Sequence, residues 1–227
     1  MNGPPILIYG NGAMARVACS YLSRSRSVLG FTVDDELIDK ASAKLAGRPV
    51  HPFSEVQSRV RPDSCEMIIA VGYRDMNALR LQRYEDAKSK GYSFTSYVDP
   101  SVIMHDGVEI GENTLILDHT SIHPGVKIGD AVFISSQVSI GHDCVIGDGA
   151  WINGGVSLGG RCHVGPQCVF GVNASAAHDV VLGARSFVGA NTLVNRAVAP
   201  DSVTLSPAGE PFRLKSQDFL SFARMQA

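Results

Sequence analysis

The sequence predicts two folds in series: a small α/β domain over residues 1–97, then a parallel β-helix over residues 98–204. A loop and a short helix are expected over residues 205–227. Three observations lead to this prediction. Short apolar runs alternate with helical patterns in the first part of the chain, and apolar residues recur at every sixth position in the second. The six-residue period then fails after Pro200.

The composition narrows the classes of protein that the chain can represent. With 227 residues, 44% of them hydrophobic, it suits two modest domains and is too apolar for a disordered chain, although 23 residues are glycine. A net charge of −2 argues against a nucleic-acid partner. Five cysteines without a C-x-x-C pair suggest neither a disulfide framework nor a zinc cluster. The sequence shows no basic leader, and no apolar run approaches the ~18 residues that a membrane span needs. A soluble cytoplasmic protein is therefore expected.

The first 97 residues show alternating strand and helix signals. Each expected strand is a short apolar or β-branched run, and most expected helices are longer and more polar. The expected strands cover residues 6–9, 28–33, 67–71 and 94–98, and the expected helices cover 13–23, a stretch ending near 45, 53–60 and 76–90. The resulting βαβαβαβ order predicts a small, Rossmann-like parallel sheet.

A glycine-rich turn follows the first expected strand. It reads Gly10-Asn11-Gly12-Ala13 and opens the first expected helix, whose amide groups could bind a phosphate. An acidic residue after the second expected strand, Asp34 or Asp35, is in the right place to bind a ribose or a base. The sheet is too short for a full nicotinamide domain. We therefore expect this domain to hold a mononucleotide.

From Val98 onward, apolar residues occupy every sixth position, seventeen times without a break. These positions are Val98, Met104, Ile110, Ile116, Ile122, Ile128, Ile134, Ile140, Ile146, Ile152, Leu158, Val164, Phe170, Ala176, Leu182, Val188 and Val194. Four residues after each stands a small or β-branched residue. Neither a helical period nor strand alternation produces this pattern, whereas short strands around a triangular prism do.

The period also assigns a place to each reactive side chain. Three hexads make one coil, so residues 18 apart stack at about one strand spacing, ~4.8 Å. Cys144, Cys162 and Cys168 fall on the small inward positions. We therefore expect these three cysteines to be core residues rather than nucleophiles or metal ligands.

One edge of the predicted prism carries two histidines, His142 and His178, with Gly160 between them. Imidazole titrates near neutral pH and can take a proton from an attacking amine or hydroxyl. Asp143 could orient His142 because both lie at a bend, and the Gly160 amide could stabilise an oxyanion. His178 and Asp179 form an alternative His-Asp pair.

Two patterns resemble a known family. The hexads over residues 98–204 resemble the left-handed β-helix of hexapeptide-repeat acyltransferases. The stretch from Ile140 to Asp148 is similar to the I-x-H-[DE]-x-x-I-G-[DE] stretch of nucleotide-sugar acetyltransferases of the sialic acid O-acetyltransferase family. The bacillosamine-pathway N-acetyltransferase is the best-described relative. The resemblance implies that His142 is the general base, that Asp143 orients it, and that the Gly160 amide stabilises the oxyanion.

The resemblance also implies ligands and an assembly. In the family, three subunits pack side by side and acyl-CoA lies between neighbouring prisms, so acetyl-CoA as cosubstrate and a homotrimer are expected. The implied coenzyme A contacts are Gly160, Gly171, Val172, Asn173, Gly189 and Ala190. The implied nucleotide-sugar contacts are Gly10, Asn11, Gly12, Ala13, Asp34, Asp35 and Arg74, with a helix cap as the alternative role of Arg74.

The first loop departs from the family pattern. Better-described members have a glycine-histidine pair there, whose histidine contacts the sugar nucleotide, whereas this chain has Ala13-Met14. The identity of the sugar is therefore left open. No histidine pair has the spacing of the zinc ligands in γ-class carbonic anhydrases, which share the β-helix, so no metal is expected.

Together these patterns predict an enzyme that moves an acetyl group from acetyl-CoA to the amino group of a nucleotide-linked amino sugar by direct attack. A sugar O-acetyltransferase with a hydroxyl acceptor is the first alternative. The second is a non-catalytic β-helix interaction protein, in which the His-Asp bend is incidental.

Overall fold

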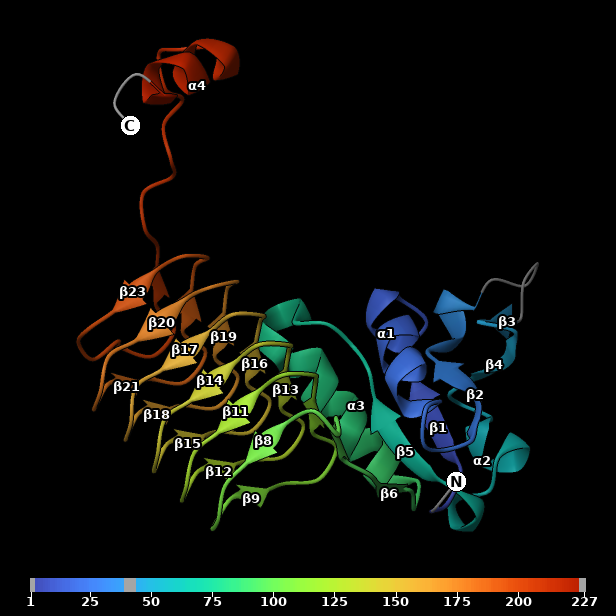
Figure 1. The fold of residues 1–227 in the computed structure, drawn as a ribbon. Helices are drawn as coiled ribbons and strands as arrows, with labels where there is room; N and C mark the ends of the chain where they lie inside the picture. The colour runs from blue at the N-terminus through green and yellow to red at the C-terminus, as the bar shows by residue number, and fades with distance from the viewer. Residues whose placement is uncertain (1–2, 39–43, 225–227) are drawn as a thin grey trace.

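The computed structural model describes residues 3–38 and 44–224. Three parts follow one another along the chain (Figure 1): an α/β part built around one sheet, a prism of short stacked strands, and a tail whose helix stands away from the prism. In these two stretches, no helix is both long enough and apolar enough to cross a membrane.

The N-terminal sheet has the strand order β3-β4-β2-β1-β5-β6. Its strands are β1 (Ile6–Tyr9), β2 (Val28–Val33), β3 (Lys44–Leu45), β4 (Arg48–Pro52), β5 (Glu66–Ile69) and β6 (Ser93–Phe94). Neighbouring strands run parallel except β3 and β4, which form an antiparallel hairpin. The expected parallel sheet is therefore a mixed one.

Helices cover both sides of this sheet. Those of the described residues are α1 (Ala13–Leu22), α2 (Val56–Arg59), α3 (Ala78–Ser89) and the 3-10 turns η1 (Asp35–Leu37), η2 (Pro62–Ser64) and η3 (Arg74–Asn77). Alternate side chains of the central strand β1 enter different cores: Ile6 and Ile8 pack with α1, whereas Leu7 and Tyr9 pack with α2 and α3. This two-sided burial explains the continuous apolar run of β1.

Two expected elements of the N-terminal part are wrong in detail, and one strand was not expected. The helical stretch expected to end near Leu45 ends instead in strand β3, and residues 39–43 of that stretch lie outside the described residues. Strand β4 was not expected, and it follows a two-residue turn at Ala46 and Gly47, both with positive φ. The single strand expected over 94–98 is two strands, because β6 ends in this sheet and the next strand begins the prism.

The prism has the predicted architecture of a left-handed parallel β-helix with three faces. The aromatic face consists of β7 (Tyr97–Val98), β10 (Leu115–Ile116), β13 (Phe133–Ile134), β16 (Trp151–Ile152), β19 (Val169–Phe170), β22 (Phe187–Val188) and β24 (Val203–Thr204). The serine face consists of β8 (Ile103–Met104), β11 (Ser121–Ile122), β14 (Ser139–Ile140), β17 (Ser157–Leu158), β20 (Ser175–Ala176) and β23 (Leu193–Val194). The third face consists of β9 (Glu109–Ile110), β12 (Lys127–Ile128), β15 (Val145–Ile146), β18 (His163–Val164) and β21 (Val181–Leu182).

Side chains on the predicted hexad positions fill the interior of the prism. From β7 to β20, each strand pairs with the strand 18 residues later, as Leu115 does with Phe133, and the hexad positions from Ile116 to Val194 are buried. The three core cysteines are buried too, as expected. Met104 is an exception at 51% exposure, because β8 is the end strand of its face and no coil covers it.

The aromatic face docks onto the N-terminal part. Leu115, Phe133 and Trp151 share one apolar cluster with the buried side of α1. Trp151, the only tryptophan, stacks on Phe133 with ring centroids 4.1 Å apart and meets the edge of Tyr73 at 5.4 Å. The two parts therefore share a continuous core.

Arg80 of α3 is a charged side chain within this junction. It is 3% exposed, and its guanidinium lies 5.0 Å from the centroid of the Trp151 ring. One nitrogen donates hydrogen bonds to the carbonyl oxygens of Gly149 at 2.6 Å and Ala150 at 3.2 Å. The helix is thus tied to a bend of the prism as well as packed against it.

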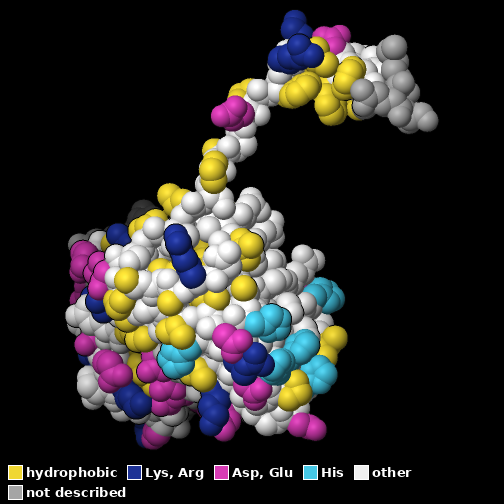
Figure 2. Space-filling view, turned by 90° about the vertical axis from the view of Figure 1, so that its left-hand side faces the viewer, with side chains coloured by type: hydrophobic (Ala, Val, Ile, Leu, Met, Phe, Trp, Pro, Cys, Tyr) yellow, Lys and Arg dark blue, Asp and Glu magenta, His cyan; other side chains and the backbone are white. Residues whose placement is uncertain are grey.

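The C-terminal tail ends in the expected helix, α4 (Ser216–Arg224). Its apolar side chains Phe219, Leu220 and Phe222 stay exposed, and the ring of Phe212 packs against that of Phe219 at 5.5 Å. Figure 2 shows hydrophobic side chains gathered on this helix, clear of the rest of the molecule.

Candidate active site

The bend between the serine face and the third face carries His105, His123, His142 and His178, four of the seven histidines. We call it the histidine corner; its successive coils are residues 105–108, 123–126, 141–144, 159–162 and 177–180. Histidine side chains gather on one side of the β-helix in Figure 2. The corner therefore concentrates groups that can exchange protons near neutral pH.

His142 and Asp143 form a hydrogen-bonded pair at this corner. The imidazole Nδ1 lies 2.8 Å from the Asp143 Oδ2. Asp143 has φ of +57°, a left-handed bend that brings the side chains of two neighbouring residues to the same side. One coil earlier Gly125 makes room for the carboxylate, since a Cβ there would lie 2.5 Å from the Asp143 Oδ1. A neutral imidazole that donates from Nδ1 keeps a lone pair on Nε2 and can act as a base.

Gly160 lies directly against this lone pair. A Cβ built on it would fall 2.5 Å from the His142 Nε2 and 2.8 Å from its Cδ2. A side chain at position 160 would therefore push the imidazole away. The side chain of His142 is 44% exposed, so Nε2 can be reached from solvent along this edge.

The alternative pair of His178 and Asp179 is not formed. Asp179 instead accepts two hydrogen bonds from the Arg161 guanidinium, at 2.7 and 2.8 Å, which lower the pKa of Asp179. The Nδ1 of His178 accepts a hydrogen bond of 2.9 Å from the Gly160 amide. The amide expected to stabilise an oxyanion therefore already has an acceptor in this structure.

The other expected coenzyme A contacts lie across the serine face from the histidine corner. The bend that precedes the serine strands β20 and β23 contains Gly171, Val172, Asn173, Gly189 and Ala190, and we call it the asparagine corner. Val172 is 52% exposed there. The histidine corner, with Gly160, follows the serine strands instead. A single chain thus presents the two expected sets at opposite edges of one face.

A cavity of about 290 Å³ lies at the ends of β1, β2 and β5 in the N-terminal part. Its lining includes six of the seven expected nucleotide-sugar contacts, namely Gly10, Asn11, Gly12, Ala13, Asp34 and Arg74. Gly10 has φ of +126° and approaches the Ala70 carbonyl so closely that a Cβ would lie 2.7 Å from it. The glycine turn is therefore needed to shape the cavity.

Asp34 is held at this cavity by two residues that the sequence did not single out. Its Oδ1 accepts a hydrogen bond of 2.7 Å from the Tyr9 hydroxyl, and its Oδ2 pairs with the Arg83 guanidinium at 2.8 Å. Burial and the neighbouring carboxylate raise the pKa of Tyr9. Asp35, by contrast, does not line the cavity, because its carboxylate bonds to the amide and hydroxyl of Ser54.

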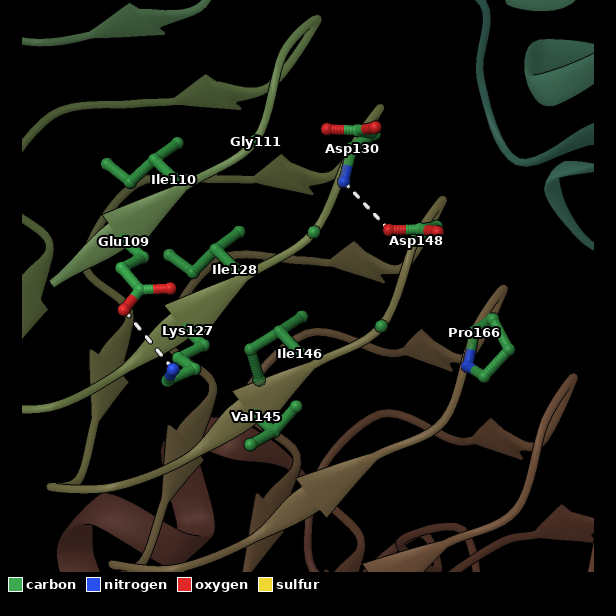
Figure 3. Close-up of a pocket in the computed structure, with 12 residues that line it drawn as sticks. Glu109, Ile110, Gly111, Lys127, Ile128, Asp130, Val145, Ile146, Asp148 and Pro166 are labelled. Carbon is green, nitrogen blue, oxygen red and sulfur yellow. Dashed lines mark hydrogen bonds and ion pairs between the residues drawn. The ribbon is translucent and has the colours of Figure 1, made fainter.

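A wider depression of about 520 Å³ lies on the third face (Figure 3). An ion pair of 3.2 Å joins Glu109 and Lys127 at one side, and the Asp130 amide donates to the Asp148 carboxylate at the other. None of the expected catalytic residues lines it. Throughout residues 3–38 and 44–224, no group of three or more His, Cys, Asp or Glu side chains is arranged to hold a metal ion.

Family models match the repeat region. The bacterial transferase hexapeptide (six repeats) model matches residues 107–142, and the hexapeptide repeat of succinyl-transferase matches residues 137–166. No curated protein matches the chain by sequence.

Solved structures match almost the whole chain. The acetyltransferase domain of PglB from Neisseria gonorrhoeae FA1090, in complex with acetyl coenzyme A, has a TM-score of 0.80 at 18% identity and covers 93% of this chain and 100% of that one. A variant of perosamine N-acetyltransferase from Caulobacter crescentus, with CoA and GDP-perosamine, has a TM-score of 0.71 at 22% identity, covering 89% and 93%. WeeI from Acinetobacter baumannii AYE has a TM-score of 0.68 at 19% identity, covering 88% and 96%.

At these identities the structures establish a common fold, from the N-terminal sheet through the β-helix. The chain carries the hexapeptide repeat of bacterial transferases and shares the two-part fold of these sugar acetyltransferase structures, which confirms the resemblance expected from its sequence.

Proposed function

We propose that the protein is an acetyltransferase that moves an acetyl group from acetyl-CoA to the amino group of a nucleotide-linked amino sugar. The observation that carries the proposal is the His142–Asp143 pair, with Nε2 open beside a glycine on the edge of a hexapeptide β-helix. The solved neighbours bind acetyl coenzyme A in one case, and CoA with GDP-perosamine in another. The amine acceptor follows from the second, which is an N-acetyltransferase.

The proposed reaction uses His142 in both proton transfers. The acceptor amine attacks the thioester carbon, and Nε2 takes the proton that the amine loses. Asp143 stabilises the resulting imidazolium through Nδ1, and the carbon–sulfur bond of the tetrahedral intermediate then breaks. The imidazolium returns its proton to the departing CoA thiolate. The described cysteines are all buried, so a direct transfer fits them better than an acyl-enzyme.

The proposal divides the chain into a nucleotide-sugar domain at residues 1–97, an acyltransferase domain at 98–204 and a tail at 205–227. Tyr9, Asp34 and Arg83 hold the base or ribose side of the cavity, and the N-terminus of α1 faces the phosphates. The expected CoA contacts lie at the asparagine corner, away from His142, so we infer that neighbouring copies in a homotrimer join the two corners. Because acetyl-CoA and nucleotide sugars are cytoplasmic metabolites, the proposed enzyme works in the cytoplasm.

The experiment that tests the proposal measures binding and turnover separately. Acetyl-CoA should raise the melting temperature of the protein, and one of a panel of uridine, thymidine and guanosine diphosphate amino sugars should release free thiol. His142→Ala should lower kcat by roughly 10²–10⁴-fold. His163→Ala, which removes an exposed histidine of the third face, should leave kcat unchanged. Absence of any acetyl-CoA stabilisation, or near-normal turnover of His142→Ala, would overturn the assignment.

A further inference from the structure

At the bends of the β-helix, some backbone amides have no partner in the neighbouring strand and donate to a side chain instead. In the bend between the third and aromatic faces, the amide of Glu112 donates to the Asp130 Oδ1 at 2.8 Å. The amide of Asp130 in turn donates to the Asp148 Oδ1 at 2.9 Å. Each of these side chains lies 18 residues beyond the amide that it caps, one coil further along. A carboxylate is a strong, charge-assisted acceptor, so these caps are firm.

At the histidine corner the equivalent cap is an imidazole. The Gly160 amide donates to the Nδ1 of His178, also 18 residues further along, at 2.9 Å. Since Nδ1 accepts this bond, the ring is neutral and its proton lies on Nε2. The carboxylate of Asp179 accepts two hydrogen bonds from Arg161, so Asp179 does not orient the His178 ring. His178 is exposed to solvent.

The capped amide lies at the centre of the proposed reaction. Gly160 is in contact distance of the His142 Nε2, so an acceptor and a thioester that meet at Nε2 also meet the Gly160 amide. That amide has one hydrogen, and both the His178 Nδ1 and a thioester oxygen would accept it. The two acceptors therefore compete.

We propose that His178 is a positioning residue whose Nδ1 reversibly blocks the Gly160 amide, the proposed oxyanion donor. We call this side chain the plug. It holds the Gly160 amide when no acyl group is present and turns away when the thioester oxygen of acetyl-CoA takes its place. A neutral imidazole suits this exchange, because a carboxylate at the same place would bind the amide more firmly and repel the developing oxyanion. This inference rests on the proposed function and adds a step to acetyl-CoA binding.

The test compares the affinity of the full-length protein for acetyl-CoA and for CoA, measured by calorimetry without acceptor. CoA has no thioester oxygen and does not compete for the amide. His178→Ala should therefore bind acetyl-CoA roughly three- to tenfold more tightly than the wild type, the worth of about one hydrogen bond, with unchanged affinity for CoA. His178→Asp, with a charged cap, should bind acetyl-CoA more weakly and CoA as before.

The matched control is Asp148→Ala, which removes the same kind of cap at a bend outside the proposed site. It should change neither affinity. If His178→Ala shifts both affinities equally, or neither, His178 is only a structural cap and the plug is overturned while the proposed function stands. If the wild type binds neither acetyl-CoA nor CoA, the proposed function itself is overturned.

Discussion

Gly160 shows how much of this site depends on a missing side chain. Its Cα lies beside the imidazole of His142, and its amide meets His178. One glycine thus sets the position of the proposed base and offers the proposed oxyanion donor. Neither function tolerates a side chain that moves the imidazole.

Gly160→Ala should lower kcat by roughly 10²-fold, because a Cβ 2.5 Å from Nε2 displaces the proposed base. The fold should survive, since the bend does not have a positive φ at this residue. Gly209→Ala is the control: it lies in the exposed tail, where a Cβ would meet no atom within 4 Å. Steady-state rates and circular dichroism would check both. Wild-type turnover in Gly160→Ala would contradict the assigned geometry.

The hexad register makes some contacts of the site predictable from the sequence, whereas other contacts cannot be predicted from it. Gly160 and His178 are one coil apart, so the 18-residue spacing places them together before any coordinates are known. Arg83 reaches Asp34 across 49 residues, through the packing of a helix on a sheet. No local pattern encodes that approach.

At the scale of elements, α3 is the helix that joins the two parts of the molecule. Burial lowers the pKa of Arg80 to about 9, because removing the charged guanidinium from water costs free energy. The Arg80 guanidinium offsets that cost through its hydrogen bonds to the carbonyl oxygens of Gly149 and Ala150 and its contact with the Trp151 ring.

Arg80→Ala should reduce the free energy of unfolding by about 2–4 kcal/mol, because it leaves the buried Gly149 carbonyl oxygen without a donor and opens a void beside Trp151. Arg80→Met, which fills the space with an apolar chain, should lose less. Arg59→Ala, at a 58% exposed side chain, should stay within about 0.5 kcal/mol of the wild type. Urea denaturation would measure all three. Equal stability of Arg80→Ala and Arg59→Ala would show that the junction does not depend on the Arg80 side chain.

The sequence did not predict elements that are stabilised by contacts with distant parts of the chain rather than by their own residue pattern. Strand β4 contains two prolines and follows a short hairpin turn, and it is a strand because β2 pairs with it. Helix α3 begins at Ala78 rather than Met76, since Asp75, Met76 and Asn77 all have positive φ. The β-helix strands were predictable because their pattern repeats seventeen times, so that no single ambiguous residue decides the assignment.

At the scale of the whole molecule, carboxylates of the β-helix bind donors of the N-terminal helices. Glu112 accepts hydrogen bonds from Lys88 at 2.7 Å and Tyr84 at 2.9 Å, and Asp118 accepts one from Tyr21 at 2.6 Å. The Lys88 bond lowers the pKa of Glu112, and bonds from Ser136 and Tyr21 lower that of Asp118.

Acid should therefore loosen the contact between the two parts. Both pKa values are lower in the folded state than in the unfolded chain, so the stabilisation is present above the unfolded values of 4.5 and 3.8 and is lost as the pH falls below them. Trp151 lies at the junction and is the only tryptophan, so its emission should shift to longer wavelength below about pH 4. Tyr21→Phe should weaken that pH dependence. Emission that stays constant until far-ultraviolet circular dichroism is lost would contradict this prediction.

The fixed spacing of the β-helix strands also limits how the length of this protein can change in evolution. Insertion of one complete coil would lengthen the prism by ~4.8 Å and return every later residue to its own face. Insertion of a single hexad would turn all later residues by one face, and a hexad inserted between Gly160 and His178 would carry the plug to a different edge. Lineages of this chain should therefore gain or lose whole coils, and do so beyond Ala190, the last of the expected coenzyme A contacts.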